Sequence, residues 1–293
     1  MKQTNRFRLW HIPVLVVLTL ATIYIMRTND AAKLPYQSEE GAIFGTVYHV
    51  KYGSSLHADI MERLLAVDSS LSMFNKQSTV SRINSGESLQ TDSLLEMVFQ
   101  FSRSISEATN GAFDVTVAPL VNAWGFGFKH DQWPDTATVD SLRQLVGWQK
   151  VSIHNHQLQK ADPRMVLDFG AVAKGFGVDE VASLFRSKGI KNFMIEIGGE
   201  IVSSGQNPKG APWRIGINKP DDDPNNLSSE MQDIIELNDC AIATSGNYRN
   251  FYIHEGRRVA HTIDPHSGFP VQHSILSSTV MAPTCAMADG FAT

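Results

Sequence analysis

The sequence contains few cysteines and no block of like charge. Its 293 residues include only Cys240 and Cys285, without CxxC spacing, which excludes a disulfide framework. A bridge between the two stays open in an oxidising compartment, but we expect two buried free thiols. The formal net charge is −5, from 25 basic and 30 acidic residues. Without a basic block, the chain is not expected to bind nucleic acid.

Long apolar runs are also scarce, and the one that stands out lies near the N-terminus. The run from Ile12 to Met26 contains no charged residue, and it follows the basic residues Lys2, Arg6 and Arg8. Counted from Leu9, the run approaches the length of about 20 residues that a membrane-spanning helix needs. This pattern predicts a signal anchor over about residues 9–26, with a basic cytoplasmic end before it and a polar linker up to residue 40.

The predicted anchor also indicates on which side of the membrane the rest of the chain lies. The positive-inside rule places the basic end in the cytoplasm and residues 41–293 on the other side of the membrane. No cysteine follows the apolar run, and Asp30-Ala31-Ala32 is a poor cleavage site. We therefore expect a single-pass protein of the bacterial inner membrane whose domain lies in the periplasm. A buried hydrophobic helix is the alternative, and cleavage of the anchor stays open.

The remaining residues alternate between helical and strand periodicity without internal repeats. Apolar spacing predicts a helix over residues 60–71, a second from about Asp92 to Gly111, and a short third over Ser141–Val146 with Asp140 as its cap. The two apolar faces comprise Ile60, Leu64, Val67 and Leu71, and Leu94, Val98, Phe101, Ile105 and Ala108. Strands are expected at 46–51, 151–154, 157–160, 166–167, 192–197, 213–218, 234–237 and 258–263. This order indicates an α+β fold rather than a regular βαβ series.

The most informative segment is LDFGAVAKGFGVDEVASLF, residues 167–185. A short apolar run leads into a glycine-rich turn and then into a helix. Such a turn points backbone N–H groups and the positive end of the helix dipole at a bound anion, so it suggests phosphate chemistry. The segment matches neither GxGxxG nor GxxxxGK[ST], and on this segment alone a purely structural turn stays open.

Taken together, eight motifs occur in the order that is typical of one family. They lie at residues 42–50, 71–84, 109–127, 167–180, 196–201, 241–252, 261–271 and 288–293. They include TNGAFDVTVAPLVNAWGFG, EIGGEI, AIATSGNYRNFY, HTIDPHSGFPV and ADGFAT. On these motifs the chain after Gly41 resembles the ApbE-type flavin transferases, which are FAD:protein FMN transferases. The resemblance implies an α+β domain of two lobes that binds FAD in the cleft between them.

The resemblance implies a phosphoryl transfer that depends on magnesium. Members of the family split FAD, release AMP and attach FMN through its phosphate to a threonine hydroxyl of an acceptor protein. The implied Mg²⁺ ligands here are Asp289, Thr293 and the main-chain carbonyl of Ala171, and hard oxygen ligands suit this ion. Asp289 and Thr293 are spaced i, i+4 in a predicted helix capped by Thr284, which places both on one face.

The resemblance also assigns contacts with FAD. Lys174 and Asp168 match family positions that contact the nucleotide. Phe44, Phe74 and the segment Ala112-Phe113-Asp114 match positions that line the flavin site, where an aromatic ring can stack on the isoalloxazine. The residues alone leave open simpler roles. Lys174 would then be a surface lysine and Asp168 a helix cap. Phe44 and Phe74 would be ordinary core residues.

His261 and Asp289 are the predicted catalytic residues, and His261 is also expected to contact FAD. A neutral imidazole can accept a hydroxyl proton near neutral pH, and His261 opens HTIDPHSG, where the family carries a functional histidine. Thr262 and Asp264 are expected to fix that turn instead. Asn247 and Tyr248, together with residues 196–200, are expected to shape the same cleft.

Three classes of function follow. The first is the FMN transferase, acting on subunits of the sodium-pumping NADH:quinone reductase or of Rnf-type complexes. The second is a magnesium-dependent FAD pyrophosphatase that gives FMN and AMP. The third is a flavin-binding protein without activity. Family members continue past the position of Thr293, so we expect residues 41–293 to be a flavin transferase domain truncated at its C-terminus. The acceptor and the oligomeric state stay open.

Overall fold

The computed structural model describes residues 11–30, 36–53, 56–127, 133–220, 230–246, 251–254 and 257–293. Asn247 and Tyr248, two of the predicted cleft residues, lie outside the described residues. A six-stranded sheet forms the centre of the domain, with its strands in the order β1-β2-β5-β6-β9-β12 and every neighbouring pair antiparallel. Its strands are β1 (Gln37–Ile43), β2 (Thr46–Tyr52), β5 (Phe193–Ile197), β6 (Glu200–Ser204), β9 (Cys240–Gly246) and β12 (Ser277–Ala282).

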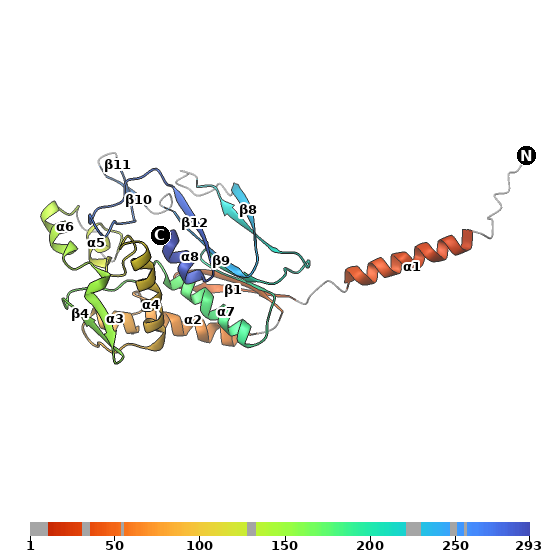
Figure 1. The fold of residues 1–293 in the computed structure, drawn as a ribbon, viewed down its shortest axis with the longest axis horizontal. Helices are drawn as coiled ribbons and strands as arrows, with labels where there is room; N and C mark the ends of the chain where they lie inside the picture. The colour runs from red at the N-terminus through yellow and green to blue at the C-terminus, as the bar shows by residue number, and fades with distance from the viewer. Residues whose placement is uncertain are drawn as a thin grey trace, which may run out of the picture.

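Three helices cover one face of this sheet (Figure 1). They are α2 (His57–Leu71), α7 (Ala173–Ser187) and α8 (Cys285–Ala292). Their apolar residues join those of the sheet in one core, in which Tyr52 and Phe185 stack at 4.7 Å between ring centroids. On the other face, the ribbon of β7 (Trp213–Asn218) and β8 (Met231–Leu237) contributes Ile215 and Leu237 to a smaller core.

A second core lies beside the sheet and gives the domain its second lobe. It is built by α3 (Thr79–Asn84), α4 (Ser93–Ala108), the ribbon of β3 (Val151–His154) and β4 (Gln157–Lys160), and the segment that leads into α7. A small cluster around Trp124 adds α5 (Ala118–Ala123) and α6 (Thr136–Arg143). The last ribbon pairs β10 (Phe251–His254) with β11 (Arg257–Ala260). The predicted α+β class is confirmed, and α7 connects the two large cores, because Phe176 belongs to the second core and Val178 to the first.

Several predicted elements are confirmed. The helix over residues 60–71 lies within α2, and all four residues of its predicted apolar face are buried. Helix α4 is capped by Asp92, whose side chain accepts the N–H of Leu95. Its buried face is turned slightly from the predicted one, because Leu95 and Phe99 are buried whereas Ala108 is exposed. The pair of β3 and β4 and the capping of α8 by Thr284 are also as predicted.

Other predictions were wrong for identifiable reasons. The short third helix is α6, which begins after Asp135, because that side chain rather than Asp140 caps it by accepting the N–H of Thr138. Residues 166–167 form no strand. The side chain of Asn84 takes the place of a neighbouring strand, accepting the N–H of Leu167 at 2.8 Å and donating to its carbonyl at 2.7 Å. The strand predicted over 258–263 ends at Ala260.

The N-terminal apolar run is helical and forms α1 (His11–Asp30). Among the residues described, no helix is both long and apolar enough to cross a membrane. The structure therefore does not support the predicted membrane-spanning helix.

Both cysteines are free, as expected. Cys285 is buried at the start of α8, but Cys240 is only partly buried at the start of β9, so the expectation of two buried thiols holds for one of them.

Helices α7 and α8 are held together by Asp179. Its Oδ1 accepts the N–H of Cys285 and its Oδ2 that of Ala286, both at 2.8 Å, so it caps α8 from the neighbouring helix. Near the start of α7, a Cβ on Gly175 would lie 2.4 Å from the carbonyl oxygen of Cys285. This close approach requires glycine and fixes the two helices against each other.

Replacing Asp179 with asparagine should lower the free energy of unfolding by about 1 kcal/mol at a pH of about 5, because asparagine turns an NH2 group, which cannot accept a hydrogen bond, toward one of the two N–H groups. Burial raises the pKa of Asp179 from 3.8 to about 6. The folded protein therefore holds this proton more tightly than the unfolded chain, and the contribution of Asp179 to stability falls as the pH rises through about 6. Denaturant unfolding of both forms at a pH of about 5 and of about 8 measures this, and an equal difference at the two values contradicts it.

Candidate active site

Two adjoining pockets lie where the two lobes meet. The larger encloses about 620 Å³ and the smaller about 290 Å³. Four residues line both pockets, namely Val121, Asp168, Gly170 and Lys174. Because Asp168 and Lys174 flank the glycine-rich turn, this turn forms the wall that the two pockets share.

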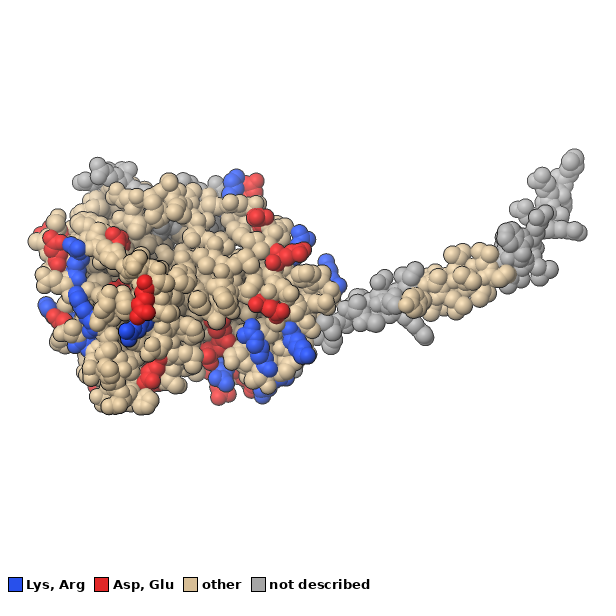
Figure 2. All heavy atoms as spheres, in the orientation of Figure 1, with Lys and Arg blue, Asp and Glu red and all other residues tan. Residues whose placement is uncertain are grey.

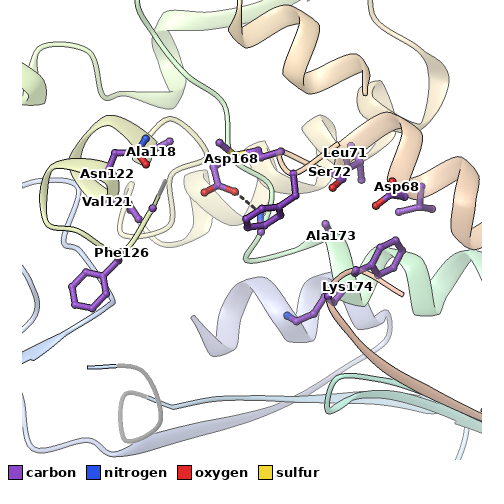
Figure 3. Close-up of a pocket in the computed structure, with 17 residues that line it drawn as sticks. Asp68, Leu71, Ser72, Ala118, Val121, Asn122, Phe126, Asp168, Ala173 and Lys174 are labelled. Atoms are coloured by element: carbon purple, nitrogen blue, oxygen red, sulfur yellow. Dashed lines mark hydrogen bonds between the residues drawn. The ribbon is translucent and has the colours of Figure 1, made fainter. Parts of the chain in front are cut away.

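The larger pocket is mainly apolar and suits a planar ring system. Figure 3 shows Ala118, Val121, Asn122 and Phe126 on one side of it and Asp68, Leu71 and Ser72 on the other. Both predicted flavin-site aromatics, Phe44 and Phe74, line this pocket. Phe44 occupies the tight turn between β1 and β2 at a φ of 53° and packs against both large cores. Phe74 is 86% exposed at the wall of this pocket.

The smaller pocket brings together the other predicted site residues. Its lining includes the consecutive residues Ala112, Phe113 and Asp114. It also includes Ala171, which lies in the glycine-rich turn that both pockets share. Further lining residues are His261, Asp289 and Thr293. These residues come from segments that are far apart in the sequence, so only the fold gathers them.

The three predicted metal ligands lie around this smaller pocket. Asp289 is 2% exposed, and its Oδ2 accepts the N–H of Gly175 at 3.0 Å. The hydroxyl of Thr293 lies one turn further along α8 and donates to the carbonyl of Asp289 at 3.2 Å. Ala171 belongs to the turn before α7.

A carboxylate, a hydroxyl and a carbonyl are hard oxygen donors, and this donor set fits Mg²⁺. Within the part of the chain that the structure describes, no three His, Cys, Asp or Glu side chains group as a metal site.

A buried charge cluster connects Asp289 to the shared wall. The Nζ of Lys174 lies 3.7 Å from Oδ1 of Asp289 and 3.2 Å from Oε1 of Glu200. Burial raises the pKa of Glu200 to about 7 and also raises that of Asp289. Burial lowers the pKa of Lys174, but the two carboxylates outweigh it, so the net shift is upward and the lysine is charged. The cluster therefore presents an ammonium group at the rim of both pockets.

The two other predicted carboxylates differ in what they can offer a ligand. Oδ1 of Asp168 accepts the N–H of Gly170 at 2.7 Å, and burial raises the pKa of Asp168. Asp168 itself lines both pockets. Asp114 instead accepts the N–H and the hydroxyl of Thr116 with Oδ1 and the N–H of Trp148 with Oδ2. Asp114 thus holds the loops of the second lobe, and its neighbours Ala112 and Phe113 present their surface to the pocket.

His261 is half-buried in the bend after β11 and lines the smaller pocket. The ring of Phe126, which lines the larger pocket, lies 6.3 Å away in an edge-to-face arrangement. As expected, Asp264 fixes the following turn by accepting the N–H groups of His266 and Ser267. His261 therefore lines the pocket together with Thr262, Ile263 and Pro265, while Asp264 fixes the turn.

Sequence reasoning missed two residues that support this site: Asp179 caps α8, and Ser245 contacts the hydroxyl of Thr293 at 3.2 Å. Glu200, which the sequence placed among the residues that shape the cleft, pairs with Lys174. A signal for Asp179 existed, because it is a charged residue within a mostly apolar stretch of α7. Glu196, in contrast, pairs across the hairpin with Ile201 on the face opposite to Glu200 and lies 3.6 Å from His49, outside the cleft that it was expected to shape.

Comparison with known proteins agrees with this architecture. The sequence model of the ApbE family matches residues 44–293. A FAD:protein FMN transferase of Vibrio cholerae is 39% identical over 266 residues, which cover 86% of this chain and 78% of that protein. The protein of the same name from Escherichia coli K12 is 35% identical over 271 residues, covering 87% and 76%.

Solved structures show the same likeness. The flavin transferase ApbE from Vibrio cholerae superposes with a TM-score of 0.77 at 37% identity, covering 88% of this chain and 85% of that one. The apo flavinyl transferase ApbE of Pseudomonas stutzeri gives a TM-score of 0.78 at 32% identity, covering 88% and 83%. Fold and site thus define an α+β protein with two adjoining pockets between its lobes. The chain belongs to the ApbE family.

Proposed function

We propose that this chain transfers FMN from FAD to a threonine hydroxyl of an acceptor protein and releases AMP, with magnesium as its cofactor. The observation that carries the proposal is the junction of two pockets at Asp168 and Lys174, next to the oxygen donors of Ala171, Asp289 and Thr293. The apolar pocket takes the flavin ring, and the junction takes the pyrophosphate. The identity to proteins named FAD:protein FMN transferase supports the same reaction.

The reaction needs charge stabilisation and one proton acceptor. The threonine oxygen attacks the phosphorus of the FMN half, the bond to the bridging oxygen of the pyrophosphate breaks, and AMP leaves with that oxygen. Lys174 offers its ammonium group to the phosphates, while Ala171, Asp289 and Thr293 would hold the cation. Bound Mg²⁺ would neutralise charge that develops on the phosphate oxygens. His261 accepts the proton of the attacking hydroxyl.

We further propose where the enzyme works and on what. The basic residues before the apolar run support a membrane-attached chain with its domain in the periplasm. On the face drawn in Figure 2, basic and acidic side chains are interspersed. Subunits of the sodium-pumping NADH:quinone reductase or of Rnf-type complexes are the proposed acceptors, because they would present threonine on the same side of the membrane. Fusion of a periplasmic reporter to the C-terminal end of the chain tests the location, and reporter activity confined to the cytoplasm contradicts it.

The rate of AMP release tests the proposed reaction. The full chain is mixed with FAD and Mg²⁺, with and without an acceptor protein, and AMP is measured by chromatography. We expect release that stops on chelation of the metal and speeds up severalfold with acceptor. Equal rates with and without acceptor would indicate a FAD pyrophosphatase, in which water replaces the threonine. FAD binding without AMP release under both conditions would indicate a flavin-binding protein and contradict the proposal.

A further inference from the structure

Glu200 is a buried acidic residue that the fold alone does not require. It opens β6 directly after the tight turn at Gly198 and Gly199, and its side chain is 6% exposed. One carboxylate oxygen, Oε1, lies 3.2 Å from Nζ of Lys174. The other, Oε2, is buried without a hydrogen-bond partner. An ionisable group in this environment costs stability, so its presence points to a role other than stabilising the fold.

The partner of Glu200 stands between two carboxylates. Lys174 is the second residue of α7, and its side chain is 30% exposed along the wall of the larger pocket (Figure 3). Its Nζ is closer to Glu200 than to Asp289, at 3.2 Å against 3.7 Å. Among the described residues, these are the two carboxylates within ion-pair distance of Lys174. The position of the Lys174 ammonium group therefore depends on how strongly the carboxylates of Glu200 and Asp289 attract it.

This arrangement matters because the carboxylate of Asp289 interacts with other groups of the fold and is also a proposed metal ligand. Its Oδ2 is engaged by the N–H of Gly175, which leaves Oδ1 as the oxygen free to bind a cation. Lys174 is the group nearest to that same Oδ1 with a positive charge. If nothing held Lys174 elsewhere, its ammonium group would compete with a metal ion for Oδ1 of Asp289.

We propose that Glu200 is a positioning residue that holds the Lys174 ammonium away from Asp289, keeping the Asp289 carboxylate available to the divalent cation. The inference rests on the proposed function, since it concerns the proposed metal site. It adds that metal affinity is set in part by a carboxylate on β6 that is not a ligand. A purely structural Glu200 would instead be replaced well by glutamine, which has the same size and buries no charge.

The test compares Glu200→Gln with Glu196→Gln in the full chain. Glu196 lies on the opposite face of the same hairpin, so its variant controls for changes in the hairpin itself. Titration calorimetry without FAD measures Mg²⁺ affinity, and AMP release at varied Mg²⁺ gives the half-saturating concentration. We expect Glu200→Gln to weaken both by about tenfold or more, as is typical for residues that support metal ligands, and Glu196→Gln to leave both unchanged.

A second pair of variants shows whether Glu200 acts through Lys174. In a Lys174→Ala background, adding Glu200→Gln should change Mg²⁺ affinity no further. The same tenfold loss in that background would mean that Glu200 acts on the cation directly, and an unchanged affinity of Glu200→Gln in the wild-type background would mean that it has no such role. Either result overturns the inference.

Two checks keep the results interpretable. Thermal unfolding of each variant shows whether it folds, and Glu200→Asp retains the charge on a shorter side chain and should show a smaller loss than Glu200→Gln. Calorimetry needs no turnover. A wild-type chain that binds Mg²⁺ but releases no AMP would therefore contradict the proposed function while leaving the inference about Glu200 to be decided by its own variants.

Discussion

Replacing Asp289 with asparagine should lower magnesium-dependent AMP release by at least about a hundredfold, while FAD binding changes little. Asparagine keeps the size of the side chain and an acceptor for the N–H of Gly175, but it removes the charge that the cation needs. Alanine is the poorer test. It would leave the N–H of Gly175 without its buried acceptor and cost about 1–3 kcal/mol of stability. AMP release at saturating FAD and fluorescence quenching of FAD measure the two effects.

Asp140→Asn is the matched control, because Asp140 lies on the exposed surface of α6 and pairs with Arg143. It should leave both measurements unchanged. Turnover of Asp289→Asn at the wild-type rate would contradict the metal assignment. A parallel loss of FAD binding and turnover would show that Asp289 serves the nucleotide instead.

Replacing His261 with alanine should lower kcat by about a hundredfold to ten-thousandfold and change the KM for FAD much less. The expectation follows from its place in the smaller pocket, next to Asp289 and Thr293 rather than among the residues of the apolar pocket. The pH profile adds a second readout, since removing a proton acceptor should flatten the rise of the rate with pH. Steady-state kinetics across pH measure both.

His154→Ala serves as its control, because His154 is exposed on β3 and lines neither pocket. A rise in KM with kcat unchanged would make His261 a binding residue. If the pH profile keeps its shape without the imidazole, another group accepts the proton.

Much of the site could be predicted from the sequence because its residues sit in short, distinctive motifs. Asp289 and Thr293 are one helical turn apart, and Thr284 signals where that helix begins. Lys174 follows a glycine-rich turn, and a short stretch of sequence is enough to specify such a turn. The class of fold could also be predicted, since periodicity shows helices such as α2 and α4 directly.

The contacts between motifs could not be predicted in the same way. The ion pair of Lys174 with Glu200 and the capping of α8 by Asp179 join segments that are distant in the chain, and no local pattern specifies such pairs. Some strands were missed for a related reason. β1 and β12 are the edge strands of the sheet, and most of their residues are exposed or only partly buried, so their sequences do not alternate between apolar and polar residues. At Leu167 a side chain, Asn84, replaced the strand that periodicity suggested.

The central claim is that the two joined pockets transfer FMN to a threonine of another protein, and the most direct test is the mass of that protein. An acceptor subunit is incubated with the full chain, FAD and Mg²⁺, and its intact mass and modified peptide are determined alongside the AMP released. We predict a gain of one FMN unit on a threonine for each AMP. AMP release with an acceptor of unchanged mass would contradict the claim.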